Sequence, residues 1–164
     1  MASTDGTKES LRRKSLGELG ELIAIKTLVD RSFTEVANLN DRKVNYPFAD
    51  LYAEKGKTKY VISIKARNKN QQDGKLNAFY NLGFNARAMA ESAETEYGAV
   101  AYWMAIQFDA RVYSVYFGSL SELNGKKAIP IRKCEEGVIG ECLEKDKRHY
   151  FDFGYFGNTS ESAT

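Results

Sequence analysis

The stretch Asp50-Leu51-Tyr52-Ala53-Glu54-Lys55-Gly56-Lys57-Thr58-Lys59-Tyr60-Val61-Ile62-Ser63-Ile64-Lys65 decides the fold. Two runs rich in β-forming residues flank a turn of Lys and Gly, which predicts a β-hairpin with strands over residues 48–53 and 59–66. Asp50 stands near the start of the first strand and Lys65 near the end of the second, so both lie far from the turn. With the right register, the hairpin brings a carboxylate and an ammonium group together at one end of a sheet.

Side chains alternate between the two faces of a strand, which sorts the polar residues of the hairpin into sets. Asp50 and Glu54 share a face on the first strand, and Ser63 and Lys65 share one on the second. A carboxylate such as Asp50 is a typical ligand for Mg²⁺, and a strand carbonyl such as that of Ile64 could add another oxygen beside water. A lysine at such a place could orient or deprotonate a water, or stabilise charge on a phosphate.

Helical and extended patterns alternate around the hairpin. Ser15 is a candidate N-cap for a first helix, whose apolar residues recur at helical spacing as far as Val29. An Ala-rich segment predicts a second helix over residues 76–96. Further strands are expected to begin at 33–36 and to cover 98–108, 111–117, 128–131, 138–143 and 150–156. The order predicts one α/β domain over residues 1–164, with a mixed central sheet flanked by helices and flexible tails at 1–12 and 158–164.

Composition narrows the class of protein. The 164 residues contain 24 Lys and Arg against 22 Asp and Glu, so a nucleic-acid surface has to be a local patch. No apolar run approaches the roughly 20 residues of a membrane helix, and the polar N-terminus lacks the apolar core of a secretory signal. The two cysteines lack zinc-site spacing, and there is a single histidine. We therefore expect a cytoplasmic protein with no membrane segment.

Three segments, in this order along the chain, resemble a known family. They are Gly17-Glu18-Leu19-Gly20-Glu21, Pro47-Phe48-Ala49-Asp50-Leu51 and Val61-Ile62-Ser63-Ile64-Lys65. Together they resemble the PD-(D/E)xK nuclease superfamily, the restriction-endonuclease-like fold that includes archaeal Holliday junction resolvases, over roughly residues 15–110. The resemblance implies an αβββαβ core in which a first-helix glutamate, a strand aspartate and an acid-x-lysine motif surround Mg²⁺. It also implies action on DNA and a homodimer.

Carried over residue by residue, the resemblance assigns catalytic roles to Glu21, Asp50 and Lys65, with Glu18 as second choice for the helix glutamate. Asp50 and Glu21 would hold Mg²⁺, or Mn²⁺, directly or through water, and the carbonyl of Ile64 would join them. The polar loop after Lys65 would lie near a nucleic-acid backbone. Its expected phosphate contacts are Arg67, Lys69 and Lys75.

Ser63 departs from the family pattern, which has Asp, Glu or sometimes Gln at this position. Serine carries no charge and is a poor metal ligand, so Ser63 would contribute at most a hydrogen bond to a metal-bound water. Either Glu21 or Glu54 compensates, or metal binding is weak, or the fold is kept without cleavage. The sequence thus predicts a metal-dependent DNA endonuclease or a degenerate member of its superfamily. The alternative is a catalytically inactive nucleic-acid-binding or protein-assembly module.

Simpler interpretations of the same residues stay open. Asp50 and Lys65 could form only an ion pair at a sheet end, worth about 0–1 kcal/mol when exposed. Glu18 and Glu21 could be a solvated first turn stabilised by the helix dipole. The run Arg12-Arg13-Lys14 could contact phosphates, but a short charged run of this kind is more typical of a solvated terminus. Residues that could stack on bases but are more typical of a core are Tyr102, Trp103, Tyr113, Tyr116 and Phe117.

Overall fold

The computed structural model describes residues 4–43 and 46–149. Its centre is a six-stranded sheet in the order β1-β2-β3-β5-β6-β8, and β4 and β7 form a separate two-stranded sheet. The large sheet consists of β1 Thr34–Asn38, β2 Leu51–Lys55, β3 Thr58–Asn68, β5 Val100–Asp109, β6 Val112–Ser119 and β8 Glu141–Arg148. The remaining elements are α1 Thr4–Asp30, η1 Leu39–Asp41, β4 Phe79–Asn81, α2 Ala86–Tyr97, η2 Leu120–Leu123, β7 Ala128–Pro130 and α3 Ile131–Glu135.

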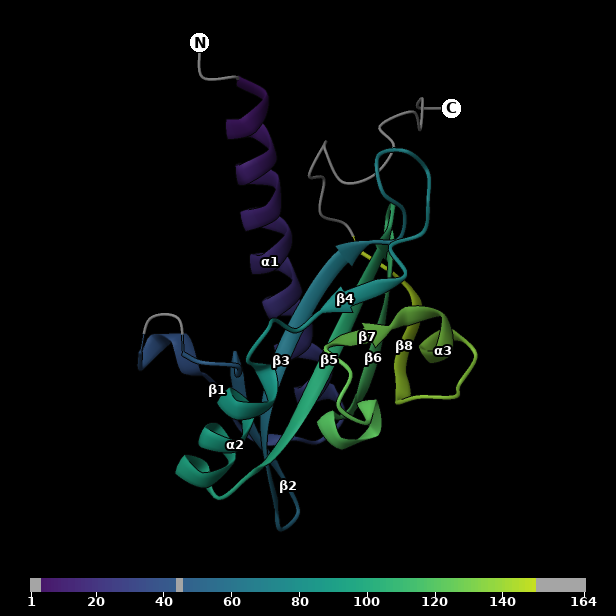
Figure 1. Ribbon diagram of the computed structural model, residues 1–164. Coiled ribbons are helices and arrows are strands. Elements are labelled where there is room, and N and C mark those ends of the chain that lie inside the picture. The colour runs from purple at the N-terminus through teal and green to yellow at the C-terminus, as the bar shows by residue number, and fades with distance from the viewer. Residues whose placement is uncertain (1–3, 44–45, 150–164) are drawn as a thin grey trace.

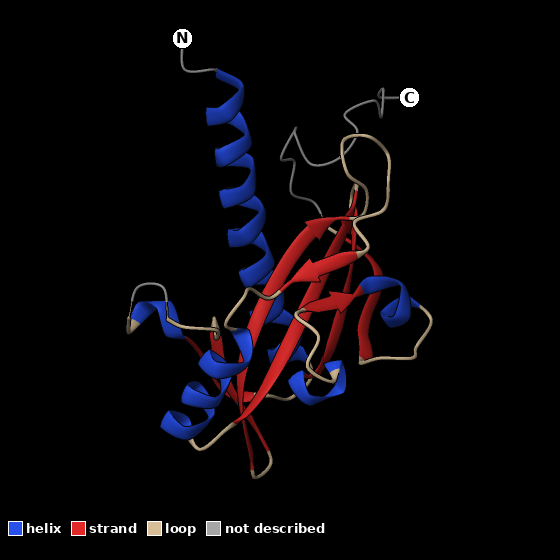
Figure 2. Ribbon diagram, in the orientation of Figure 1, coloured by secondary structure: helices blue, strands red, loops and turns tan. Residues whose placement is uncertain are grey.

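Both faces of the large sheet are covered (Figure 1, Figure 2). On one face α1 packs its apolar stripe, including Leu19, against sheet residues such as Ile62. On the other face α2 and the small sheet enclose a second core, in which Ala90 and Tyr80 gather with Trp103 of β5. Successive strand residues point to opposite faces of the sheet, so they belong alternately to the two cores. The mixed α/β architecture predicted from the sequence is confirmed.

The hairpin forms with the register that the site requires. β2 pairs antiparallel with β3 as far as Leu51 opposite Ile62. Gly56 in the turn has a φ of 61°, a left-handed conformation that glycine adopts without strain. β3 continues past the start of β2 and pairs in parallel with β5 as far as Asn68 opposite Phe108. β3 therefore has the predicted central position, and its second half has an edge that β2 does not cover.

α1 is longer than predicted. It begins at Thr4 rather than at Ser15, so residues 4–12, expected to belong to a flexible tail, form its first turns. Lys, Glu and Arg are good helix formers, and polarity alone does not separate an exposed helical turn from an unstructured tail. The other expected tail at 158–164 and the expected strand at 150–156 lie outside the described residues. Among the described residues, no helix combines the length and the apolar composition of a membrane span.

The second helix is shorter than predicted. The expectation of helix from residue 76 was wrong, because α2 begins at Ala86 and Phe79–Asn81 forms β4 against β7. Gly83 has a φ of 102°, which excludes a helix through this position. The strand expected over residues 138–143 likewise starts only at Glu141, after glycines with positive φ, and the unpredicted α3 follows β7.

Candidate active site

Beyond the start of β2, the edge of β3 that faces β2 has no strand partner. Asp50 immediately precedes β2, and its backbone N–H donates to the carbonyl of Ile62 at 2.8 Å. Its side chain replaces the next backbone partner of β3: Asp50 Oδ2 accepts a hydrogen bond from the N–H of Ile64 at 2.7 Å. The N–H and C=O of one strand residue point to the same edge. The Ile64 carbonyl therefore faces the edge at which the Asp50 carboxylate lies.

Glu21 reaches the same place from α1. Its Oε2 atom accepts from Nδ2 of Asn38, at the end of β1, at 3.4 Å. Burial raises the pKa of Glu21 most, the negative charge of Asp50 raises it further, and the Asn38 hydrogen bond opposes both. The charge of Asp50 disfavours the ionisation of Glu21 in a partly buried place, and a nearby cation would stabilise both carboxylates.

Asp50 is the more deeply buried of the two carboxylates. Burial raises its pKa, while the Ile64 N–H, the charge of Lys65 and the side chain of Asn40 favour the ionised form without cancelling the effect of burial. The ionised site is therefore short of positive charge. Among the described residues, no group of three or more His, Cys, Asp or Glu side chains gathers as a metal cluster. Two carboxylates, a carbonyl and water nevertheless suit Mg²⁺, which keeps several of its waters.

Lys65 lies near Asp50 but does not form an ion pair with it. It is partly buried, and its charge lowers the pKa of Asp50. The ion pairs formed by the described residues do not include Asp50 with Lys65. The simple interpretation of the two as a structural ion pair is thus not what the geometry shows. Lys65 remains able to contact a water or a phosphate near these carboxylates.

Ser63 lies next to the site and points into the core. It is 1% exposed and shares its face of β3 with Val61, a member of the core under α2. One residue past the last β2–β3 pair, Leu51 with Ile62, Asp50 stands across from Ser63. The serine therefore occupies the place next to Asp50 where the resemblance implies an acid. As a result the described site has two close carboxylates rather than three.

The structure separates Glu54 from this group. Glu54 pairs with Lys59 beside the hairpin turn, and it is four residues from Asp50, or about 13 Å along an extended strand. Glu54 therefore does not replace the missing acid. Glu18 lies one helical turn before Glu21 on the exposed side of α1, and its charge raises the pKa of Glu21 less than the charge of Asp50 does.

The three basic residues expected at the DNA backbone have different surroundings. Arg67 is exposed near the end of β3 and lines an open pocket. Lys69 Nζ lies 3.8 Å from Asp109 Oδ2, in an ion pair across to β5. Lys75 is exposed in the loop that follows β3 and does not line that pocket. Of the three, Arg67 has the placement that best suits a phosphate contact.

Asn38 and Asn40 are functional candidates that the sequence pattern did not reveal. Asn38 Oδ1 accepts from the backbone N–H of Asn40 at 2.9 Å and so begins η1. Asn40 Oδ1 accepts from the backbone N–H of Tyr46 at 3.2 Å, and the Asn40 side chain lowers the pKa of Asp50. The sequence offered one signal, a loop rich in asparagine just before Asp50, but asparagine is common in ordinary turns as well.

No protein-family model matches the chain, and no curated protein sequence matches it. Its fold, however, is similar to that of Archaeoglobus fulgidus Hjc, a Holliday junction resolvase from an archaeal hyperthermophile. The TM-score is 0.52 with 18% identity, over 74% of this chain and 90% of Hjc. The chain has a restriction-endonuclease-like fold. The fold implied by the sequence resemblance is thus confirmed, and at this identity the chemistry has to follow from the side chains themselves.

Proposed function

We propose that this protein is a metal-dependent endonuclease that hydrolyses phosphodiester bonds in DNA. The observation that carries the proposal is the approach of Glu21 and Asp50, from separate elements, at the open edge of β3 beside Lys65. A structural ion pair needs one carboxylate. Here the pKa of both carboxylates is raised, so the arrangement disfavours the ionised apoprotein and favours a bound cation. The fold likeness to a Holliday junction resolvase supports the same conclusion.

Each residue has a role that follows from its place. Glu21 and Asp50 would hold Mg²⁺ or Mn²⁺, together with the carbonyl of Ile64 and water. Such a metal would supply Lewis-acid chemistry, which polarises a phosphoryl oxygen and lowers the pKa of a bound water. Lys65 would position the attacking water or balance charge on the phosphate. Asn38 and Asn40 would fix the orientation of the two carboxylates, as hydrogen-bond partners of metal ligands commonly do.

Ser63 supports a second candidate function, a catalytically inactive nucleic-acid-binding or protein-assembly module. Fewer negative ligands weaken divalent metal binding. The hydroxyl group at this position adds no charge, and at 1% exposure Ser63 has little access to solvent. In that case the protein would bind DNA or another protein through the same fold without hydrolysing the backbone.

A cleavage assay separates the two functions. Linear duplex, single-stranded and branched DNA, including a four-way junction, would be incubated with Mg²⁺ or Mn²⁺. We expect cleavage by the wild type, and a loss of at least about 100-fold in Lys65→Ala, the usual size of an acid–base contribution. Asp50→Asn should also be inactive. No cleavage of any substrate would leave the inactive module as the answer, and cleavage retained by both variants would place the active site elsewhere.

The proposal includes a homodimer, which rests on the sequence resemblance alone. Light scattering at the concentration of the cleavage assay should give twice the mass of the chain, 18.4 kDa. A monomer that cleaves DNA would remove the dimer from the proposal and leave the chemistry intact. The cytoplasmic location stays a prediction from the sequence.

A further inference from the structure

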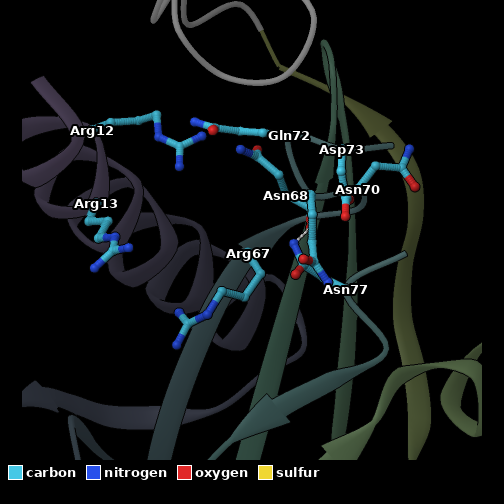
Figure 3. Close-up of a pocket in the computed structure, with 9 residues that line it drawn as sticks. Arg12, Arg13, Arg67, Asn68, Asn70, Gln72, Asp73 and Asn77 are labelled. Carbon is cyan, nitrogen blue, oxygen red and sulfur yellow. Dashed lines mark hydrogen bonds between the residues drawn. The ribbon is translucent and has the colours of Figure 1, made fainter. Parts of the chain in front are cut away.

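An open pocket lies between α1 and the loop that connects β3 to β4 (Figure 3). Its volume is about 930 Å³. Arg12 and Arg13 of α1 and Arg67 of β3 line it, together with amide side chains such as that of Asn68, at the end of β3, and that of Gln72, in the loop. Figure 3 shows Arg12 and Gln72 extending toward each other from the two walls. The pocket thus combines guanidinium groups from one side with neutral hydrogen-bonding groups from the other.

The helical part of the wall is positioned by the core. Arg12 lies four and seven residues before Leu16 and Leu19, which are buried residues of α1. Residues at this spacing share one face of a helix, so Arg12 continues the sheet-facing stripe past the place where the core ends. Residues 4–12 belong to the helix, which gives Arg12 and Arg13 a fixed position rather than that of a solvated terminus.

The loop wall is held in place by its own hydrogen bonds. The N–H of Gln71 donates to the carbonyl of Lys75 at 2.7 Å, and Asn77 Nδ2 donates to the carbonyl of Asn68 at 2.7 Å. Asp73, which is the acidic residue of the lining, accepts from the backbone N–H of Lys75 at 3.0 Å. Three arginines against one aspartate leave the lining positive. A wall ordered before binding loses little conformational entropy when a ligand arrives.

We propose that this pocket binds the phosphodiester backbone of a DNA strand and leads that strand to the site of Glu21, Asp50 and Lys65. This inference rests on the proposed function. The planar guanidinium group matches phosphate in a two-point hydrogen bond, and amide side chains donate to phosphates and sugars.

The distances along the elements fit a path for one strand. Arg13 precedes Glu21 by eight residues in α1, which is about 12 Å at a helical rise of about 1.5 Å per residue. Arg67 follows Lys65 by two residues, which is about 7 Å along a strand. Phosphates in one strand of a duplex recur about every 3.4 Å of helix axis. The three arginines would therefore contact phosphates within a few nucleotides of the bond at the active site.

The test is equilibrium binding of a fluorescent duplex and a fluorescent four-way junction in EDTA, where cleavage does not interfere. We expect Arg12→Ala/Arg13→Ala to weaken binding at least about tenfold. The slope of log K against log salt should fall by about 1.8, the value for two lost phosphate contacts. Arg67→Ala should lower the slope by about 0.9. Unchanged binding or an unchanged slope in these variants would overturn the inference.

A matched control removes the same charge elsewhere. Arg132 and Lys133 are an adjacent, exposed basic pair in α3. Arg132→Ala/Lys133→Ala should change affinity less than about twofold, and a loss equal to that of the pocket variant would show that only net charge matters. If Arg12→Ala/Arg13→Ala fails to fold, Arg12→Lys/Arg13→Lys and Arg67→Ala decide. The lysine pair should keep most of the salt slope.

Two further measurements distinguish this inference from a small-molecule phosphate pocket and from the proposed nuclease activity. Thymidine monophosphate should compete only at far higher concentration than an oligonucleotide, because it fills one phosphate position. Equal competition would identify a small-molecule phosphate pocket and overturn the assignment to a DNA strand. Binding that depends on the pocket while no DNA is cleaved would sustain this inference and remove the nuclease. Cleavage with unchanged DNA affinity in the pocket variant would do the reverse.

Discussion

Gly20 of α1 packs directly on Ala66 of β3. A Cβ atom on Gly20 would lie 2.6 Å from the Cβ of Ala66. The next residue of α1 is Glu21, and the residue before Ala66 is Lys65, so one close contact between a helix and a strand sets both site residues. Only glycine allows the helix backbone to approach this near. The position of the first catalytic candidate thus depends on the absence of a side chain beside it.

Gly20→Ala should therefore damage both stability and the site. The added methyl group clashes with Ala66 and displaces α1, which costs about 1–3 kcal/mol in a packed core. The same displacement moves Glu21 away from Asp50, so Mn²⁺ affinity should fall. Urea unfolding and metal titration by calorimetry would measure the two effects.

Gly17→Ala is the control for Gly20→Ala, since a Cβ at Gly17 meets nothing within 4 Å. This change should stabilise α1 by about 0.5–1 kcal/mol, the usual gain of Ala over Gly in a helix, and leave metal binding unchanged. Adding Ala66→Gly to Gly20→Ala should recover part of the lost affinity. A double variant as weak as Gly20→Ala would show that this contact does not position Glu21.

Asp50→Asn should stabilise the metal-free protein at neutral pH. Burial raises the pKa of Asp50, so its folded-state pKa exceeds the unfolded one. Such a group contributes stability below the unfolded pKa and loses it as pH rises through the folded pKa, which leaves an unfavourable charge at pH 7. Asparagine keeps an oxygen for the Ile64 N–H. We expect a melting temperature higher by roughly 2–4 °C, or about 1 kcal/mol.

The gain should shrink as the pH falls through the folded pKa and vanish only below about pH 3, where Asp50 is protonated in both states. Added Mn²⁺ should raise the melting temperature of the wild type and not that of Asp50→Asn. Asp109→Asn, at an exposed ion pair with Lys69, should change stability by less than about 1 kcal/mol at any pH. A lower melting temperature for Asp50→Asn than for the wild type at pH 7 would contradict an unfavourable buried charge at this position.

Local pattern was enough to predict the hairpin and its neighbours. The alternation around Gly56 predicted both strands, although β2 covers Leu51–Lys55 rather than residues 48–53. It placed Asp50 and Lys65 at the same end of the hairpin, in agreement with the pairing of Leu51 with Ile62. The burial of the Ser63 side chain could not be predicted in the same way. Its face follows from alternation, but whether that face is solvent or core depends on α2 and β4, which lie later in the chain.

The sequence did not single out the asparagines, and it did not show where the Arg12–Arg13 pair lies, for the same reason. Asn40 acts on Asp50 across a loop, and nothing in the polar run from Asn38 to Asp41 distinguishes it from a surface turn. Arg12 gains its place from Leu16 and Leu19 docking α1 on the sheet. Tertiary packing sets the positions and contacts of such residues, and patterns in a single sequence do not reveal that packing.

Ser63→Glu should destabilise the apoprotein, and bound metal should restore the lost stability. Ser63 is 1% exposed, so a glutamate there is buried beside Asp50 and adds a third carboxylate. Without metal, we expect a loss of about 2–4 kcal/mol from the buried charge and the larger volume. Mn²⁺ should then raise the melting temperature of Ser63→Glu by more than it raises that of the wild type, and calorimetry should show tighter binding.

Ser114→Glu is the matched control, because Ser114 is 2% exposed in β6 and bonds to the backbone of Asp146 away from the site. It should lose similar stability with no recovery by Mn²⁺. Equal metal responses of the two glutamate variants would show that position 63 does not face the metal, even in a folded protein.

Asn40→Ala should make metal binding more sensitive to acid. The Asn40 side chain lowers the pKa of Asp50, so its removal raises that pKa further and lets protons compete with Mn²⁺ up to a higher pH. Affinity should fall roughly tenfold at pH 6, the scale of other lost partners of metal ligands, and much less at pH 8. Asn85→Ala, whose side chain makes no capping hydrogen bond at the start of α2, should leave the pH profile unchanged. An equal loss at both pH values would indicate that Asn40 only supports the loop through Tyr46, because a purely structural defect does not depend on the proton that Asp50 binds.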